Sequence, residues 1–176
     1  MNGILLRHLN DWPERIKKWQ KGGHKKMSVR DIHSSTVSRT LLLFADVKPE
    51  PKQSTRFTLS GHAYTSAKKR KYLEKLVQEF LRGIQKGFTQ FEGRLRVTVI
   101  YAFPWRKSDS KLSKNQSWAY MDKRPDVDNL FKPVGDALQT AGIIKDDGQI
   151  VEIRARKIRT AIHGIAVKVE QISEFI

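Results

Sequence analysis

The fold of this chain is decided by a short acidic motif and by the residues that follow it. The motif is Arg124-Pro125-Asp126-Val127-Asp128-Asn129-Leu130-Phe131-Lys132, and a second acidic stretch follows it at Lys145-Asp146-Asp147-Gly148-Gln149-Ile150. The chain of 176 residues carries 34 Lys and Arg against 18 Asp and Glu, which gives a formal net charge of +16. Carboxylates gathered this densely in so basic a chain are candidates for a divalent metal site.

The residues after the motif have the spacing of an amphipathic helix. Asp128, Lys132 and Asp136 recur at i, i+4 and i+8 on the side opposite an apolar stripe. The stripe consists of Leu130, Val134, Ala137, Leu138 and Ala141. Pro133 costs about 3 kcal/mol in a helix interior, so it indicates either a helix that starts near Asp128 or a kink near the site. We predict that the apolar face packs against the rest of the domain and that the opposite face carries the functional side chains. Gly142 is predicted to end the helix.

Two further segments before the motif have clear periods. Apolar residues alternate with polar ones between Arg94 and Phe103, which predicts a strand. The segment from Ser66 to Gly87 is predicted to be a helix, with Ser66 as its cap. Its apolar positions recur at three and four residues and are Leu73, Leu76, Val77, Phe80, Leu81 and Ile84.

Three more strands complete the predicted order. The apolar run from Leu41 to Val47 predicts a buried strand, and Gln149 to Thr160 alternates with period two. Residues 164–172 are predicted to complete a hairpin with that strand through Ala161-Ile162-His163. The order from Leu41 is strand, helix, strand, helix, strand, strand, which places the chain in the α/β (α+β) class.

Composition limits the classes of protein that fit this chain. A 39% hydrophobic fraction and a mean hydropathy of −0.54 indicate a soluble folded domain with one appendage. The longest apolar run, Leu41 to Ala45, is far shorter than a membrane span, and Met1 to Leu6 lacks the apolar core of a signal peptide. We therefore expect a cytoplasmic protein without a membrane partner. The absence of cysteine excludes disulfides and thiolate zinc sites, and carboxylate ligands favour Mg²⁺ or Mn²⁺.

The positive charge predicts a polyanionic partner. Residues 1–72 hold 16 Lys and Arg against 5 Asp and Glu, while residues 73–176 hold 18 against 13. Nucleic acid is the partner that we expect, because a surface this basic attracts phosphate. Anionic lipid and heparin are alternatives that charge alone leaves open.

Residues 1–39 are predicted to be a basic N-terminal extension of a domain that comprises residues 40–176. Trp12, Ile16 and Trp19 have helical spacing, and the basic stretch 21–26 follows them. The extension is either an arm that grips DNA phosphate or a short helix and tether without a role. Met27 is an alternative start of the protein.

Two polar segments are candidates for DNA contact. Residues 52–65 mix basic, hydroxyl and aromatic residues, and residues 104–124 interleave Trp105, Trp118 and Tyr120 with basic residues. An ordinary polar loop in the first case and a mobile loop in the second are the alternatives. These segments and the predicted helix from Ser66 to Gly87 supply the candidate DNA contacts, which are Lys52, Arg56, Lys69, Arg106, Lys107, Lys123 and Arg124.

The acidic residues have both a catalytic and a purely structural interpretation. Asp126 and Asp128 lie at a helix start, and Asp147 follows a turn beyond the helix end. If the three met, their repulsion would favour a bound cation such as Mg²⁺, and Lys132 would stabilise charge on the phosphate. Alternatively, these acids cap the helix, form a turn or make i,i+4 pairs. Asp146 and Asp147 are adjacent, so at most one of them is expected to bind the metal directly.

These residues resemble the signature of RusA-type Holliday junction resolvases. The resemblance rests on the motif at 124–132, on Asp136-Ala137-Leu138 and on Asp146-Asp147-Gly148-Gln149-Ile150, and it extends upstream to Lys48-Pro49-Glu50-Pro51-Lys52, Phe57 and Tyr64. It covers about residues 40–172 and leaves the basic extension unexplained.

The resemblance implies a homodimeric, Mg²⁺-dependent endonuclease that cuts four-way DNA junctions in pairs, on a small mixed sheet with two main helices. It implies metal binding by Asp126, Asp128 and Asp147 and an essential role for Lys132. Asn129, Asp136 and Asp146 are expected to support the site. A two-fold substrate suits a dimer with two identical sites. A broader branched-DNA endonuclease and a basic DNA-binding protein without catalysis remain the alternatives.

Overall fold

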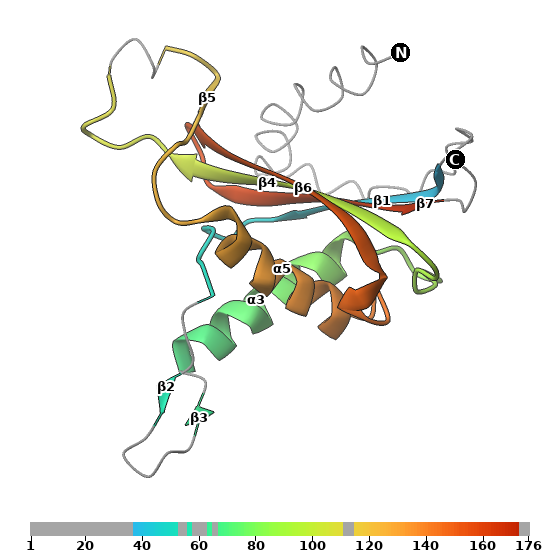
Figure 1. The fold of residues 1–176 in the computed structure, drawn as a ribbon. Coiled ribbons are helices and arrows are strands. Elements are labelled where there is room, and N and C mark those ends of the chain that lie inside the picture. Colours follow the sequence, from blue (N-terminus) through green and yellow to red (C-terminus); the bar gives the residue numbers. More distant parts are fainter. Residues whose placement is uncertain (1–36, 53–55, 58–62, 65–66, 111–114, 173–176) are drawn as a thin grey trace.

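The protein contains one mixed β-sheet with two helices on one of its faces (Figure 1). The computed structural model describes residues 37–52, 56–57, 63–64, 67–110 and 115–172. The helices are α3 (Ala67–Gly83) and α5 (Val127–Thr140), and a 3₁₀ turn, η1 (Asp147–Gln149), follows them. The sheet has the order β1 (Val37–Ala45), β7 (Gly164–Ile172), β4 (Leu95–Pro104), β6 (Ile150–Thr160), β5 (Trp118–Tyr120). A separate small ribbon pairs β2 (Arg56–Phe57) with β3 (Ala63–Tyr64). The predicted α+β class is confirmed.

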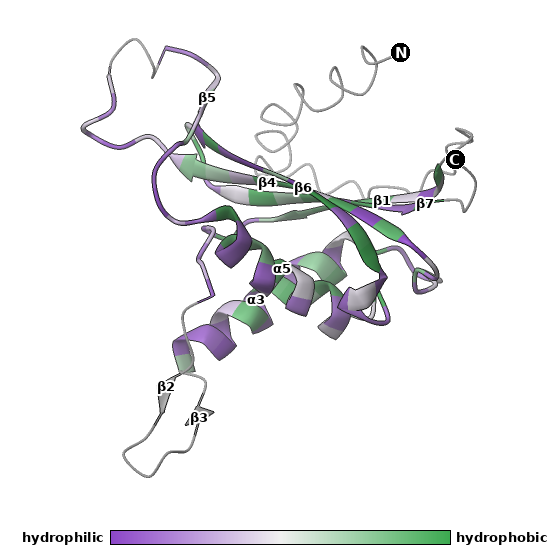
Figure 2. Ribbon diagram, in the orientation of Figure 1, coloured by the Kyte–Doolittle hydropathy of each residue, from purple (hydrophilic) through white to green (hydrophobic). Residues whose placement is uncertain are grey.

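The core lies between the two helices and the sheet, where apolar residues face each other (Figure 2). The central strand β4 is buried along nearly its whole length. Its Val97, Val99 and Tyr101 pack against side chains of both helices, including Leu76, Phe80, Leu130, Val134 and Leu138. Burial of each large apolar side chain contributes about 1.5–3 kcal/mol, so this layer holds α5 against the sheet.

Helix α5 begins at Val127 despite the internal Pro133. A proline has no N–H group, so the carbonyl of Asn129, four residues earlier, lacks its usual intrahelical donor. That carbonyl accepts a hydrogen bond from the backbone N–H of Lys52 at 2.7 Å. The proline therefore frees a carbonyl that ties the β1–β2 connection to α5. Gly142, with φ +68°, lies just after the helix end, as predicted.

The predicted hairpin between the last two long strands was wrong. β4 lies between β6 and β7, pairing parallel with β6 and antiparallel with β7. The three residues 161–163 therefore pass over the end of β4 and span two strand spacings, about 10 Å. Alternation with period two identifies a strand but not its partner, and the strongly apolar β4 is the partner that both strands share.

Other boundaries differ slightly from the predictions. β1 begins at Val37, before the expected Leu41, and α3 ends at Gly83, before the expected Gly87. The irregular segment 104–124 contains the short strand β5, which pairs with β6. The predictions for residues 1–36, including the helix with Trp12, lie outside the described residues. Among the described residues, no helix is long and apolar enough to cross a membrane.

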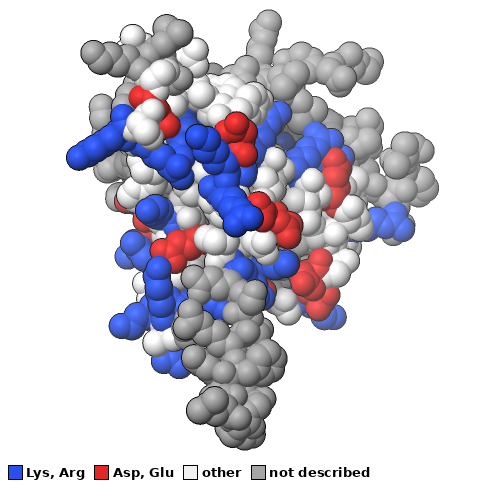
Figure 3. All heavy atoms as spheres, turned by 60° about the vertical axis from the view of Figure 1, so that its left-hand side comes forward, with Lys and Arg blue, Asp and Glu red and all other residues white. Residues whose placement is uncertain are grey.

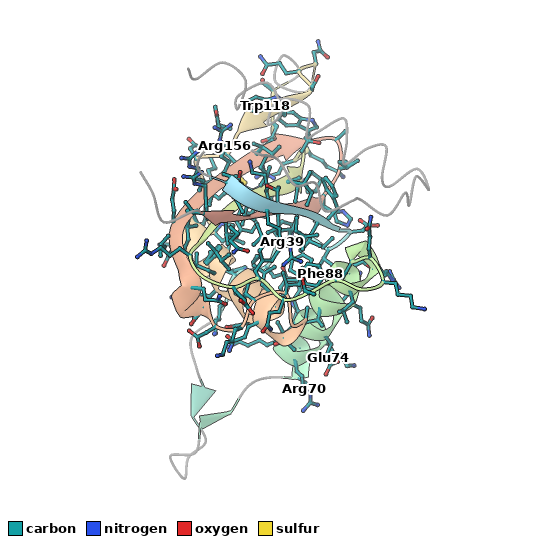
Figure 4. All side chains as sticks on the ribbon, turned by 90° about the vertical axis from the view of Figure 1, so that its right-hand side faces the viewer. Arg39, Arg70, Glu74, Phe88, Trp118 and Arg156 are labelled. Atoms are coloured by element: carbon teal, nitrogen blue, oxygen red, sulfur yellow. The ribbon has the colours of Figure 1, made fainter. Side chains whose placement is uncertain are left out.

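Arg39 of β1 fastens the segment after α3 to the edge of the sheet (Figure 4). Its guanidinium lies 4.8 Å from the ring centre of Phe88 and 4.3 Å from that of Phe91. It also donates hydrogen bonds to the carbonyls of Thr89 and Gln90. Cation–π contacts of this kind contribute about 0.5–2 kcal/mol, so Arg39 holds the connection between α3 and β4 in place.

Candidate active site

The acidic motif lies at the N-terminal end of α5, and residues 126–132 are called the acidic turn. Asp126 is the N-cap residue, yet its side chain makes no capping hydrogen bond. Asp128 is exposed, and its Oδ2 lies 4.0 Å from Nζ of Lys132. Lys132 also donates to Oδ1 of Asn129 at 3.3 Å. The carboxylate of an N-cap Asp normally accepts a hydrogen bond from a backbone N–H group of the first helical turn. Because the carboxylate of Asp126 makes no such bond, it is available for another ligand.

Asp136, one turn further along α5, is engaged with Lys52. The Nζ of Lys52 lies 2.8 Å from Oδ2 of Asp136, and both side chains are nearly half exposed. An ion pair this exposed contributes little to the free energy of folding. Together with the backbone hydrogen bond from Lys52 to Asn129, it places the β1–β2 connection beside the acidic turn. Lys52, predicted as a DNA contact, thus also holds a loop at the site.

Lys157 of β6 is a residue of this site that sequence reasoning missed. Its Nζ donates to the carbonyls of Lys123 and Pro125, at 2.8 Å each. These contacts hold the segment that leads into Asp126, which includes the cis peptide bond Arg124–Pro125. In the sequence, Lys157 belongs to an alternating strand and has the appearance of a surface lysine. Only the approach of the 123–125 segment to β6 reveals its role.

If Asp126 binds a catalytic metal, as the sequence predicts, Lys157→Met is expected to reduce DNA nicking by about 10- to 100-fold, the range for residues that orient a metal ligand. The reason is that the segment before Asp126 loses both of its hydrogen bonds to Nζ of Lys157. Nicking assays on purified protein measure the effect, and Lys86→Met removes the same charge from an exposed site as the control. Unchanged nicking in Lys157→Met would show that Asp126 needs no support from β6.

The second acidic stretch lies at the opposite end of α5. The helix has 14 residues and is therefore about 21 Å long. In Figure 1 the chain leaves α5 at the end remote from β5 and enters β6 there. Among the residues that the structure describes, no group of three acidic or histidine side chains is close enough to share a metal. Within one chain, Asp126 and Asp128 lie at the same end of α5, whereas Asp147 lies beyond the other end.

The two acids of the second stretch have different environments. The Oδ1 of Asp146 accepts a hydrogen bond from the N–H of Gly148 at 2.7 Å, as part of a capping box with Gln149. Asp147 occupies the exposed first position of η1. Asp146 therefore shapes the turn, while Asp147 presents its carboxylate to solvent.

Gln149 holds this turn against the rest of the domain. Its Oε1 accepts from the N–H groups of Lys145 and Asp146. Its Nε2 donates to the carbonyls of Phe91 and Gly93. The glutamine of the acidic stretch thus has a structural role, which is to fix the backbone on which Asp147 lies.

Gln149→Ala is expected to lower the free energy of unfolding by about 1–3 kcal/mol, because four side-chain hydrogen bonds, one of them partly buried, are lost together. Urea unfolding followed by circular dichroism measures the change. Gln139→Ala, at an exposed position of α5, is the control and should change stability by less than about 0.5 kcal/mol. Equal stability of the two variants would contradict the role given to Gln149.

The predicted DNA contacts lie on several parts of the domain. Figure 3 shows Lys and Arg side chains spread over one face of the molecule, with Asp and Glu among them. Arg106 and Arg124 line a cavity that also contacts Asp126, and Lys107 and Lys123 are exposed beside them in the sequence. Lys69 lies in the first turn of α3, and the side chain of Arg56 lies outside the described residues.

Comparison with known proteins agrees with the acidic motif and its fold. The chain is 29% identical over 79 residues to a crossover junction endodeoxyribonuclease rusA of Lactococcus phage r1t. That alignment covers 45% of this chain and 54% of the relative, so the match spans about half of the relative's length. The sequence model of the family described as endodeoxyribonuclease RusA matches residues 46–170, well over half of the chain. The protein therefore belongs to the RusA endodeoxyribonuclease family.

Proposed function

We propose that this protein is an endonuclease that resolves four-way DNA junctions by paired, Mg²⁺-dependent hydrolysis of phosphodiester bonds. The observation that carries the proposal is the uncapped Asp126 beside Asp128 and Lys132 at one helix end. This arrangement occurs in a chain of net charge +16 that belongs to a family of endodeoxyribonucleases.

The donor groups at this end of α5 suit Mg²⁺. Proteins commonly bind Mg²⁺ through one or two carboxylates, with waters and substrate phosphate completing the shell. Asp126 and Asp128 supply two carboxylates that are exposed to solvent. Bound there, Mg²⁺ would polarise the phosphate and lower the pKa of a coordinated water. Mn²⁺ has the same ligand preferences and is expected to substitute.

The other polar residues at this end of α5 are proposed to bind DNA phosphate and to stabilise the negative charge that develops on it during cleavage. Lys132 lies one helical turn from Asp128, so its ammonium group is placed to stabilise negative charge on the phosphate. Asn129 accepts a hydrogen bond from Lys132 and limits the positions of that ammonium group. Arg106 and Arg124 bind backbone phosphate beside Asp126.

The position of Asp147 favours a homodimer in which each metal site takes carboxylates from both chains. Asp147 lies a whole helix length from Asp126 within one chain, so it can only join such a site from a second copy. A two-fold arrangement in which the acidic ends of two α5 helices face opposite ways would complete two identical sites at once.

The edge of the sheet beside Asp147 is suited to this contact. Within the described part of the chain, β5 pairs only with Ile158 to Thr160 of β6, so most of the outer edge of β6 is open. Val151 and Ile153, on that open part, are 58% and 50% exposed. Open strand edges with exposed apolar residues are typical sites of association, which supports β6 as part of the dimer interface.

The test is an assay with a labelled four-way junction and a matched linear duplex, each with Mg²⁺ or with EDTA. We expect paired nicks in the junction with Mg²⁺, none with EDTA, and at least about tenfold slower cutting of the duplex, equivalent to about 1.4 kcal/mol in the barrier. Absence of Mg²⁺-dependent nicking would leave a DNA-binding protein without catalysis. Equal cutting of flaps and three-way junctions would favour a broader branched-DNA endonuclease.

A further inference from the structure

A cavity of about 940 Å³ lies next to the acidic turn of α5. It forms where the carboxyl end of β4, the connection after β1 and the segment before α5 meet, and Arg159 of β6 contributes to its lining. In α/β folds, the carboxyl ends of parallel strands such as β4 and β6 are common positions for ligands. Pockets for small ligands have volumes of roughly 300–1,000 Å³, so this one has room for a whole nucleotide.

The floor and one wall of this cavity are apolar and aromatic. Phe103 and Met121 are each only 6% exposed, and the half-buried Trp105 stands beside them. The backbone N–H of Trp105 donates to the carbonyl of Thr160 at 3.0 Å, which fixes the backbone of Trp105 to β6. Aromatic side chains that line a nucleic-acid site are typical stacking surfaces for a nucleobase, and Trp105 is the aromatic residue of this lining with the more exposed side chain.

The rim of the cavity carries more positive than negative charge. Five cationic side chains line it against two carboxylates, those of Glu50 and Asp126. Glu50 already pairs with Lys68 at 3.4 Å, and its N–H donates to the phenol oxygen of Tyr72, which fixes the loop. The cations are Lys48, Lys52, Arg106, Arg124 and Arg159.

Arg159 is the buried member of this group. Its Nη1 donates to the carbonyl of Pro104 at 2.9 Å, and Asp109 lies 3.9 Å from its Nε. Burial and the neighbouring Arg106 lower the pKa of Arg159, whereas Asp109 raises it. A guanidinium stays charged in proteins, so two arginines at this rim repel each other, and a bound phosphate would relieve the repulsion.

We propose that this cavity binds one unstacked nucleotide of the strand to be cut, with its base against Trp105 and its phosphates on the surrounding Lys and Arg side chains. The proposal rests on the proposed nuclease function. Asp126 and Asn129 belong both to the cavity and to the acidic turn, so a nucleotide held here places its phosphodiester bond at the carboxylates.

An unstacked nucleotide bound in this cavity would give the proposed nuclease a preference for branched DNA. A base within a duplex reaches such a cavity only after unpairing and unstacking, which costs a few kcal/mol, and the cost is least where stacking is already broken. The branch point of a junction offers such nucleotides. The cavity therefore selects the branch by the ease of unstacking, while the basic surface binds any DNA backbone.

Photo-cross-linking tests the position of the base in the wild-type protein. A junction that carries 5-iododeoxyuridine at the nicked nucleotide of the branch point is bound in EDTA, irradiated, and mapped by mass spectrometry. We expect cross-linking at Trp105. Cross-links outside the cavity, or equal yields when the label lies deep within one arm, would overturn the proposal.

Two variants of Trp105 test the stacking contact in the same EDTA complex. Loss of a base–aromatic stack weakens binding by roughly 5- to 150-fold, so Trp105→Leu is expected to bind the junction about tenfold more weakly, whereas Trp105→Phe keeps wild-type affinity. With an abasic nucleotide at the branch, wild type and Trp105→Leu should bind equally. An unchanged affinity of Trp105→Leu, or the same loss on the abasic junction, would overturn the proposal. If Trp105→Leu fails to fold, the cross-link in the wild type decides.

The two proposals fail in distinguishable ways. Junction nicking without a Trp105 cross-link removes the nucleotide cavity and leaves the nuclease function. A Trp105 cross-link to a labelled single-stranded oligonucleotide, in a protein that nicks no junction, supports the cavity and removes the proposed function.

Discussion

Asp128→Asn is expected to lower the rate of junction nicking by more than about 100-fold. Loss of a residue that only orients a metal ligand lowers activity by about 10- to 100-fold, and Asp128 is proposed to bind the metal directly. The amide keeps the shape of the side chain but has no negative charge with which to hold Mg²⁺. Junction binding should be unchanged or slightly tighter, because one negative charge is removed near DNA phosphate. Nicking and gel-shift assays on the same preparation measure the two effects separately.

Asp122→Asn is the matched control for this variant. Asp122 is exposed and precedes the motif by a few residues, so the same chemical change is made outside the proposed metal site. Its nicking rate should equal that of the wild type. A normal rate in Asp128→Asn would show that the acidic turn of α5 does not bind the metal.

Mixing two inactive variants is expected to restore nicking if each site combines carboxylates from two chains. Asp128→Asn and Asp147→Asn are each expected to be inactive alone. In a mixed dimer, one site contains both substitutions and the other contains neither. Random pairing makes about half of the dimers mixed, so nicking should return to about a quarter of the wild-type rate. The measurement is the nicking rate after the two variants are unfolded together and refolded.

The same mixture distinguishes this arrangement from a site within one chain. If all three acids of a site belonged to one chain, every site in every dimer would carry one substitution and the mixture would stay inactive. Mixing Asp126→Asn with Asp128→Asn provides a control, because these two residues share one helix end and no combination leaves an intact site. Activity in that control would contradict the pairing of Asp126 with Asp128.

The parts of the fold that sequence predicted best are those in which one local period decides the structure. β4 has an apolar residue at every second position from Leu95 to Phe103, and α5 has a complete apolar stripe, so both elements appear close to their predicted bounds. The partner of a strand depends on residues far away in the chain, which explains why the hairpin through residues 161–163 was predicted wrongly. Pro133 looked unfavourable in the sequence because the carbonyl of Asn129 that it leaves without a donor accepts from the N–H of Lys52. Lys52 lies far away in the sequence, so this compensation could not be predicted.

The grouping of residues in the acidic turn could be predicted from the sequence, but the residues of other strands that hold the neighbouring segments in place could not. Asp126, Asp128, Asn129 and Lys132 lie within two helical turns, so the spacing alone places them together. Lys157 and Arg159 act through backbone carbonyls of other segments, and no sequence pattern marks such contacts. The distance of Asp147 follows from the length of α5, which the apolar stripe already defined.

The strand pairing of the main sheet has a consequence for synthesis of the protein. β1, β4 and β5 all precede β6 and β7, and within the described ranges each of them pairs only with β6 or β7. A growing chain therefore lacks the partner strands of β1, β4 and β5 until β6 and β7 have been made. At about 5–20 residues per second, several seconds pass in which β4 is unpaired and prone to aggregation. The sheet that carries the proposed nuclease site can form only after β6 and β7 have been made, which would keep a growing chain that lacks them from cutting DNA.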